Sequence, residues 1–311
     1  ISFDGYLGRS AVAVNGSRAS EVKIDDLQKS KDGFGVFGNY SSTEGTTPTY
    51  GNNWFDNQQV TYDTKWTYTP LKYWLPKGHI DFLAYAPFNA GTVNNTYCLD
   101  FTVSSAIDKQ IDLLWAHADN QTKANNPVTF NFNHALAKIG YTVKTKDADA
   151  GTTITLNKIT LAGSADGKTN AFYTKGTIDL SKDLPKPSTS ITDLWATSNN
   201  DTKQKFDWFS GTQKLATTDY KNPDADYLFV IPQDFSASAA DNLYVIVEYT
   251  IEGYKGVTTP MKNTVYQKLE QEFKQGKAYT INLTIGLTPI EFDADVTPWG
   301  NGDNEDINSW N

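Results

Sequence analysis

The chain has 311 residues and a formal net charge of −9, from 27 basic and 36 acidic side chains. This length suits two domains that each bury a core of their own. The acidic balance, without any lysine-rich block, excludes nucleic-acid-binding and anionic-membrane surfaces from the expected functions. The single cysteine, Cys98, excludes an internal disulfide framework and a cysteine-based zinc site.

The first 18 residues contain both arginines of the chain, Arg9 and Arg18, and all other basic side chains are lysine. Two arginines placed at random would both fall there with a probability of roughly 0.003. The chain starts without an initiator methionine, so we expect a trimmed chain or a mature form that has lost an export signal. Apolar residues of this segment are predicted to pair as a first strand: Ile1, Phe3, Val12 and Val14.

The rest of the chain has a hydrophobic pattern with a period of two, which indicates strands. The glycine-rich segment FGVFGNY, 34–40, is interpreted as a strand with close backbone approaches. Helices are predicted only at 104–114 and 265–274. Further strands are predicted, in chain order, at 80–85, 128–132, 139–144, 153–161, 227–231 and 243–251.

The last part of the chain has the strongest strand pattern. In 279–287, apolar residues alternate with Thr, Asn and Gly, which predicts a half-buried strand. Pro289 follows, and the phase of the alternation changes. A second strand is then predicted, in which four apolar residues alternate with acidic residues and Thr: Ile290, Phe292, Ala294 and Val296.

Clusters of turn residues separate these strands at the spacing of β-sandwich proteins. The sequence therefore predicts an all-β protein with two tandem β-sandwich domains and little helix. The polar stretch 120–127 has no apolar face to bury, so we expect the domain boundary there. The predicted domains are residues 1–126 and 127–311.

Motifs for cofactor binding and catalysis lack the context that they need. The segment GFGVFG, 33–38, matches the dinucleotide-binding pattern, but no strand precedes it and no helix opens from its last glycine. No G-x-S-x-G motif provides a serine nucleophile. Two carboxylates can be nominated as acid and base in any sequence, but the separation between them is unknown. We therefore predict no enzymatic activity and no cofactor.

Metal-ligating patterns are missing from the sequence as well. His79, His117 and His134 do not fall in metal-binding spacings and are interpreted as structural or surface residues. Two aspartate pairs have a two-residue spacing that would place each pair on one strand face: Asp224 with Asp226, and Asp293 with Asp295. No calcium-binding loop surrounds them, so they are interpreted as solvated polar faces, and no metal site is predicted.

Aromatic residues are abundant, with eight tryptophans and 17 tyrosines, and their faces can stack on sugar rings. The densest cluster is WTYTPLKYWLP, 66–76, which makes Trp66, Tyr73 and Trp74 candidate glycan-stacking residues. The alternative interpretation is that these large side chains fill the cores of the sandwiches.

Six segments of the chain follow one another in an order that is typical of one family: FGVFGNY, WTYTPLKYWLPKGHIDFLAYAP, IDLLWAHA, FNFNHALAKIGYTV, YLFVIPQ and FKQGKAYTINLTIGLTPIEFDADVTPW. Together they resemble the fimbrillin (Mfa-like) family of type V pilus subunits and related cell-surface adhesins of Gram-negative anaerobes. Each segment is only a short strand pattern. Their preserved order along almost the whole chain carries the resemblance.

The resemblance implies an exported lipoprotein precursor at the outer membrane and cell surface, attached only through a lipid anchor outside this sequence. It implies two transthyretin-like (Greek-key) β-sandwich domains and a non-enzymatic role in adhesion. Other pilus subunits are the implied partners, with host proteins or glycans as further candidates. In this family's scheme an arginine-specific protease cuts near the N-terminus, the first strand leaves, and a strand of the next subunit enters the groove by donor-strand exchange.

The two arginines are then candidate processing sites. A cut after Arg18 would remove the whole first strand, whereas a cut after Arg9 would leave the AVAV residues behind, so Arg18 is preferred. The strand 290–296 is the candidate last or donor strand, because residues 300–311 have few apolar side chains. Three questions stay open. The two arginines could be stray residues in a lysine-biased chain and not processing sites. The subunit could take the stalk, tip or anchor position, or the protein could instead be a stand-alone glycan-binding surface lipoprotein.

Overall fold

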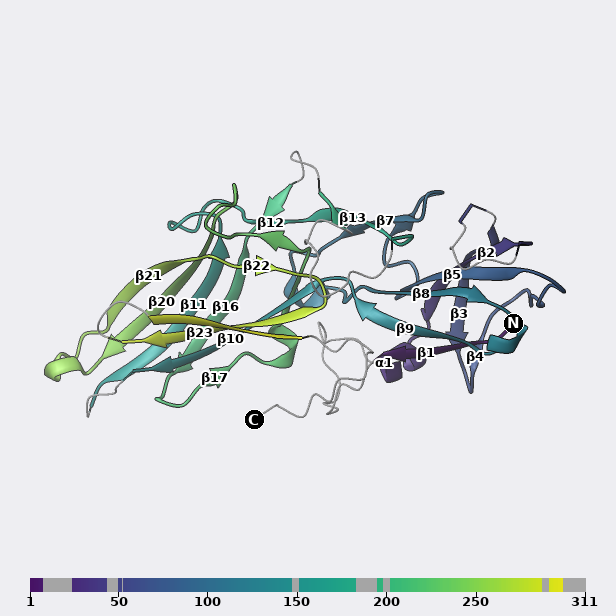
Figure 1. The fold of residues 1–311 in the computed structure, drawn as a ribbon. Helices are drawn as coiled ribbons and strands as arrows, with labels where there is room; N and C mark the ends of the chain where they lie inside the picture. The colour runs from purple at the N-terminus through teal and green to yellow at the C-terminus, as the bar shows by residue number, and fades with distance from the viewer. Residues whose placement is uncertain are drawn as a thin grey trace.

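The structure is a computed structural model that describes residues 1–7, 24–43, 50–51, 53–146, 151–182, 195–197, 202–286 and 291–298. Within these ranges nearly all regular structure is β, and the one α-helix is α1 (Ile24–Lys29). The predicted all-β fold with little helix is therefore confirmed. No helix of the described part is long and apolar enough to cross a membrane. Figure 1 shows an elongated molecule, with the first strands at one end and the last strands toward the other.

A seven-stranded sheet forms the N-terminal half. Its strands pair in the order β1, β9, β8, β5, β2, β3, β4, and all neighbours are antiparallel except β1 and β9, which are parallel. The sheet is curled, because its two edge strands β1 and β4 contact each other. The bounds are β1 (Phe3–Leu7), β2 (Phe34–Ser41), β3 (Asn53–Tyr62), β4 (Trp66–Thr67), β5 (His79–Ala86), β8 (Leu114–Gln121) and β9 (Val128–His134).

Both faces of this sheet are buried at its centre. β5 has the sequence HIDFLAYA and is buried along its whole length, with Ile80 and Phe82 on one face and Leu83 and Tyr85 on the other. The first face lines the inside of the curl and forms what we call the N-terminal core. This core is rich in phenylalanine: Phe3, Phe34, Phe55, Phe82, Phe130 and Phe132.

The second face packs on what we call the junction core, to which both halves of the chain contribute. Leu83 and Trp115 of the seven-stranded sheet lie in one cluster with Trp195 and Phe229 from later segments. The indole N–H of Trp195 donates to the carbonyl oxygen of Ala135 at 2.7 Å. A four-stranded sheet covers this core in the order β14, β13, β7, β6: β6 (Thr92–Val93), β7 (Cys98–Thr102), β13 (Lys175–Asp179) and β14 (Trp195–Ala196).

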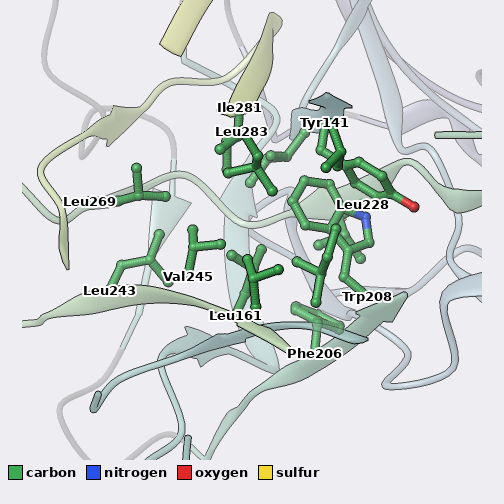
Figure 2. Packing of buried hydrophobic residues seen from close by; sticks show 14 of the residues in the cluster. Tyr141, Leu161, Phe206, Trp208, Leu228, Leu243, Val245, Leu269, Ile281 and Leu283 are labelled. Atoms are coloured by element: carbon green, nitrogen blue, oxygen red, sulfur yellow. The ribbon is translucent and has the colours of Figure 1, made fainter. Parts of the chain in front are cut away.

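Two sheets form the C-terminal half and pack face to face. One has the order β17, β10, β23, β24, with β18 also paired to β10, and the other has the order β16, β11, β20, β21. The core between them, which we call the C-terminal core, gathers Leu161 and Val245 from one sheet with Tyr141, Ile281 and Leu283 from the other (Figure 2). The bounds are β10 (Ala137–Thr145), β11 (Thr153–Ala162), β16 (Phe206–Lys214), β17 (Tyr220–Lys221), β18 (Leu228–Val230), β20 (Leu243–Glu252), β21 (Met261–Leu269), β23 (Lys277–Ile285) and β24 (Glu291–Pro298).

Short elements connect these sheets. Two small antiparallel pairs, β12 with β15 and β19 with β22, and four 3-10 helices complete the described part. Their bounds are β12 (Phe172–Tyr173), β15 (Lys203–Gln204), β19 (Gln233–Asp234), β22 (Glu272–Phe273), η1 (Ile107–Lys109), η2 (Lys123–Asn125), η3 (Asp224–Asp226) and η4 (Tyr254–Gly256).

The chain passes from one half to the other more than once. β9 pairs with β1 and β8 in the N-terminal sheet, and β10 begins the C-terminal sandwich after only two intervening residues. β13, from further along the chain, returns to pair with β7. The predicted division after residue 126 stays a prediction, and the change of sheet lies between β9 and β10.

The predicted strands correspond to β2, β5, β9, β10, β11, β18, β20, β23 and β24, so these predictions are confirmed. The glycine-rich GFGVFG segment lies largely in β2 and opens no helix.

The two predicted helices are wrong. Residues 265–274 form the end of β21 and all of β22, and residues 104–114 contain the short η1 and the first residue of β8. Val265 and Leu269 have helical spacing, but they stand opposite Val247 and Leu243 on β20. Strand pairing against a buried neighbour therefore overrides the local pattern. The helix α1, in contrast, was not predicted.

Candidate functional site

The first strand, β1, lies at the edge of the N-terminal sheet. It runs parallel to β9, from Phe3 opposite Val128 to Leu7 opposite Phe132, and the amide of Val128 donates to the carbonyl oxygen of Ser2 at 2.9 Å. Within the described part, β9 is the only strand that pairs with β1. A five-residue parallel ladder on one side is a weaker attachment than the two-sided pairing of a central strand.

Phe3 anchors this strand in the N-terminal core. Its side chain is 5% exposed and contacts four aromatic rings, with centroid distances of 5.5 Å to Phe55, 5.4 Å to Tyr68, 5.5 Å to Phe82 and 5.7 Å to Phe130. We call these four rings the Phe3 cage. Since most of them approach edge to face or tilted, each adds a specific contact to the burial of apolar area.

The N-terminus itself is held by the segment after β4. The amino group of Ile1 donates to the carbonyl oxygen of Lys72 at 2.7 Å, and the hydroxyl of Tyr68 donates to the carbonyl oxygen of Ile1 at 2.8 Å. The amide of Ser2 donates to the side chain of Asn126 at 2.8 Å. Burial lowers the pKa of the Ile1 amino group and raises the pKa of Tyr68. The two residues that precede β1 are thus held by hydrogen bonds on both sides, although the strand itself lies at an edge.

The sequence interpretation missed this role of residues 68–72. It offered the aromatic cluster either as sugar-stacking or as core-filling residues. In the structure, Tyr68 belongs to the Phe3 cage and the ammonium of Lys72 donates to the carbonyl oxygen of Trp54. The signal in the sequence was only the density of aromatic residues. Which strand they would contact depends on the curl of the sheet.

The predicted first-strand and processing residues are only partly described. Phe3 lies in β1 and Ile1 directly precedes it. Val12, Val14, Arg9 and Arg18 lie outside the described residues. Their roles therefore stay predictions.

The candidate donor strand is β24, which pairs antiparallel with β23 at the edge of its sheet. Phe292, Ala294 and Val296 stand opposite Leu283, Ile281 and Tyr279. Ile290 lies outside the described residues. The predicted strand therefore exists, and its use as a donor is not tested by the fold.

The three candidate glycan-stacking residues lie in different environments. Trp66 is 6% exposed and packs against Phe34 and Tyr62, at centroid distances of 4.8 and 5.2 Å, so it offers no free face to a sugar. Trp74 is half-buried, and its indole N–H donates to Asn126 at 3.2 Å. Tyr73 is 74% exposed. Of the three, only Tyr73 and part of Trp74 face solvent.

The histidines are paired with aspartates inside the protein. His79 lies beside Asp81, with Nε2 and Oδ2 3.2 Å apart, and His134 lies beside Asp112 at 3.0 Å; all four side chains are buried. His117 lies 3.8 Å from Asp119. These pairs fit the structural interpretation of the histidines. Among the described residues, no group of three or more His, Cys, Asp or Glu side chains is arranged to hold a metal ion.

The predicted strand face formed by Asp224 and Asp226 is wrong, because both residues lie in the 3-10 helix η3. Pro223 caps this turn, and burial raises the pKa of Asp226. Asp293 and Asp295 do lie in a strand, β24.

Taken together, the fold and the site define an elongated all-β protein of packed sheets whose first strand, β1, lies at a sheet edge. The model of the fimbrillin-like family matches residues 17–299, and the chain belongs to this family. The resemblance seen in the six segments is thereby confirmed. Membership supports a fimbrial or adhesive role at the cell surface.

Solved structures with a similar fold come from Bacteroides. A fimbrial protein from Bacteroides vulgatus has a TM-score of 0.69 at 21% identity, covering 96% of this chain and 99% of that chain. A proposed cell adhesion protein from Bacteroides ovatus has a TM-score of 0.52 at 16% identity, covering 96% and 97%. One from Bacteroides uniformis has 0.51 at 18% identity, covering 86% and 91%. At these identities the likeness shows the fold alone. No curated protein matches the chain.

Proposed function

We propose that this chain is a non-enzymatic fimbrial subunit that assembles by donor-strand exchange after proteolysis near its N-terminus. In this proposal the precursor is exported and held at the outer membrane by a lipid outside the sequence. A cut after Arg18 removes β1, and the partner is another pilus subunit that supplies a strand. Family membership supports the setting, and the geometry of β1 supports the mechanism.

The observation that carries the proposal is the position of Phe3. In the described part of the chain β1 pairs with β9 alone, at a sheet edge, yet it places a large aromatic side chain among four rings of the core. Its loss would expose apolar surface together with the backbone donors and acceptors of β9. A replacement strand with an aromatic residue satisfies both needs, as in other β-strand additions.

The stability lost when β1 leaves favours its replacement by another strand over an edge of β9 that stays unpaired. Burying a phenylalanine side chain contributes about 1.5–3 kcal/mol, and a strand partner also satisfies the hydrogen-bonding groups of the β9 edge. An open slot would make the cut chain prone to pairing with any available strand. The cut subunit could therefore accept a strand and assemble, whereas in the uncut subunit β1 still occupies the edge of β9.

Treatment of the purified chain with an arginine-specific protease tests the proposal. We expect a cut after Arg18 that leaves the body intact, followed by growth into larger species, measured by mass spectrometry and light scattering together. The matched controls are Arg9→Lys, which should still grow, and the double variant Arg9→Lys with Arg18→Lys, which should not, because a cut after either arginine would release β1 (Phe3–Leu7). A chain that is cut after Arg18 and stays monomeric would reject processing-triggered assembly.

The second candidate function is glycan binding by a stand-alone surface lipoprotein. The favouring observation is a solvent-facing loop in which Tyr73 is 74% and Leu71 65% exposed, next to the half-buried Trp74. Binding to a glycan array that is lost in Tyr73→Ala, but retained in Tyr266→Ala, would support this function. Tyr266 is the matched control because it is an exposed tyrosine on β21.

A further inference from the structure

The segment that follows β4, residues 70–76 with the sequence PLKYWLP, has its charged and apolar side chains on the opposite sides from those expected. The ammonium of Lys72 turns inward, donates to the carbonyl oxygen of Trp54 and lies 5.2 Å from the ring centroid of Phe55. Leu71 and Tyr73, on either side of it, are exposed. Charged groups normally face water and large apolar side chains normally face the core. We call Leu71 and Tyr73 the apolar tip, and their exposure indicates a contact with something outside the chain.

The apolar tip is held in place by its neighbours. The indole N–H of Trp74 donates to the side chain of Asn126 at 3.2 Å, and its ring packs edge to face on Phe82. On the other side of the tip, the side chain of Gln58 donates to the carbonyl oxygen of Thr69 at 3.2 Å. The tip is therefore presented without the ordering cost that binding imposes on a loose loop.

Single exposed apolar side chains are normal on protein surfaces. In the described part of the chain five large apolar side chains are exposed: Leu71, Tyr73, Ile111, Val257 and Tyr266. The first two stand only two positions apart, whereas the other three are separated in the sequence. Exposed prolines, Pro70 and Pro76, flank the pair. The clustering distinguishes the apolar tip from the scattered residues.

Charge in this segment differs from that of the whole chain. Between Asp63 and Asp81 there are three lysines and no acidic residue, although the net charge of the chain is −9. Lys65 and Lys77 are exposed, and Asp81 is buried. The acidic balance of the whole chain argues against an anionic membrane surface, but charges more than about 8 Å away are largely screened at physiological ionic strength. Leucine and tyrosine between lysines suit the interface of an anionic lipid bilayer.

The N-terminus lies beside the apolar tip. The nitrogen of Ile1 donates to the carbonyl oxygen of Lys72 at 2.7 Å, and Figure 1 shows the N-terminus and β4 at the same end of the elongated molecule. In the proposed precursor the lipid precedes Ile1, so a chain held by that lipid would meet the membrane with this end. A single acyl chain binds a bilayer only marginally, and a second contact makes the attachment stable.

We propose that the apolar tip inserts into the interface of an anionic lipid bilayer, with Lys65 and Lys77 beside the lipid phosphates, and forms a second membrane contact of the precursor. The inference rests on the proposed function and adds to it a surface, a lipid class and an orientation. Proteolysis near the N-terminus would remove the lipid and leave the tip as the one contact. Because one weak contact binds reversibly, the cut subunit could then leave the membrane.

A fluorescent label on the tip tests the insertion. The uncut chain carries an N-terminal hexahistidine tag, which holds it on vesicles that contain nickel-chelating lipid in place of the proposed lipid. In a Cys98→Ser background, the environment-sensitive dye NBD is attached to Tyr73→Cys or, as the matched control, to Tyr266→Cys on β21. On phosphatidylglycerol vesicles we expect the emission of the label at 73 to shift to the blue and to be quenched by spin-labelled lipid. The label at 266 should show neither change.

Unlabelled variants test the native side chains. Leu71→Ser with Tyr73→Ser should bind phosphatidylglycerol vesicles about tenfold more weakly than the wild type in sedimentation, whereas Val257→Ser with Tyr266→Ser should bind like the wild type. Lys65→Glu with Lys77→Glu should weaken binding to phosphatidylglycerol and not to phosphatidylcholine vesicles. Thermal unfolding of each variant checks that the fold persists.

The outcomes separate the inference from the proposed function, because the vesicle assays use the uncut chain and require no assembly. A label at 73 that responds no more than the label at 266 overturns the lipid contact. Glycan-array binding that is lost with the tip, without any response to vesicles, also overturns it and assigns the tip to sugar recognition. Cut chains that stay monomeric reject strand exchange instead, whatever the vesicles show.

Discussion

Phe3 links the N-terminal segment to the core more than any other described residue of that segment. Its ring is buried among four others that come from β3, β5, β9 and the segment after β4. Asp4, the next residue, is exposed, and its carboxylate accepts a hydrogen bond from the amide of Gly5 at 2.9 Å. Neighbouring residues of one strand therefore differ sharply in what their loss would do.

We predict that Phe3→Ala in the uncut chain lowers the free energy of unfolding by about 3–5 kcal/mol, as for other buried aromatic residues. Asp4→Ala should change it by no more than about 0.5 kcal/mol. Urea unfolding followed by tryptophan fluorescence measures both. A loss below about 1 kcal/mol for Phe3→Ala would mean that β1 is not held through its cage.

At the scale of elements, strands could be predicted where apolar and polar residues alternate because one strand face is buried and the other exposed, as in β23 and β11. The helix predicted at 265–274 failed because its apolar spacing of four residues also fits a strand whose buried neighbours come from β20, which local sequence does not reveal. The first strand and Phe3 could be predicted, but not the Phe3 cage. Its rings lie between 52 and 127 positions from Phe3 in the sequence, and only the curl of the sheet brings them together.

β23 pairs with β24, and the ionisation of Tyr279 on β23 makes the stability of this strand depend on pH. Burial raises the pKa of Tyr279 to about 12, and its hydroxyl accepts from the amide of Lys274 at 2.8 Å. Because the folded-state pKa lies above the ordinary value of about 10, the stabilisation is complete below pH 10 and is lost as the pH rises toward 12.

We therefore predict that the free energy of unfolding falls between about pH 10 and 12, and that the fall is smaller in Tyr279→Phe. Tyr73→Phe is the control and should leave the slope unchanged, because that side chain is exposed in the folded chain. Urea unfolding at a series of pH values measures the slopes. Identical slopes in the wild type and Tyr279→Phe would contradict the assignment.

The whole molecule is held together by the junction core. Trp195 and Phe229 pack in one cluster with Leu83 and Trp115 of the N-terminal sheet, and β13 pairs with β7 across the two halves of the chain. The halves share buried surface and not merely a linker. Their stabilities are therefore coupled.

We predict a single calorimetric unfolding transition for the uncut chain, because neither half retains its core when the other unfolds. Trp195→Ala should separate the transition into two or broaden it, since it removes a buried indole and its hydrogen bond to Ala135. Tyr266→Ala, on an exposed strand face, should leave a single transition. Two transitions in the wild type would contradict the coupling.

In the proposed assembly, the slot of β1 receives a strand of another subunit, and the positions of slot and donated strand set the symmetry of the fibre. A contact that joins two different patches is heterologous, and unless its rotation closes a ring it repeats without end as a helical filament. Such a filament is polar: one terminus presents an unfilled slot and the other an undonated strand. Its growth could then be stopped at either end by a subunit that lacks only one of the two features.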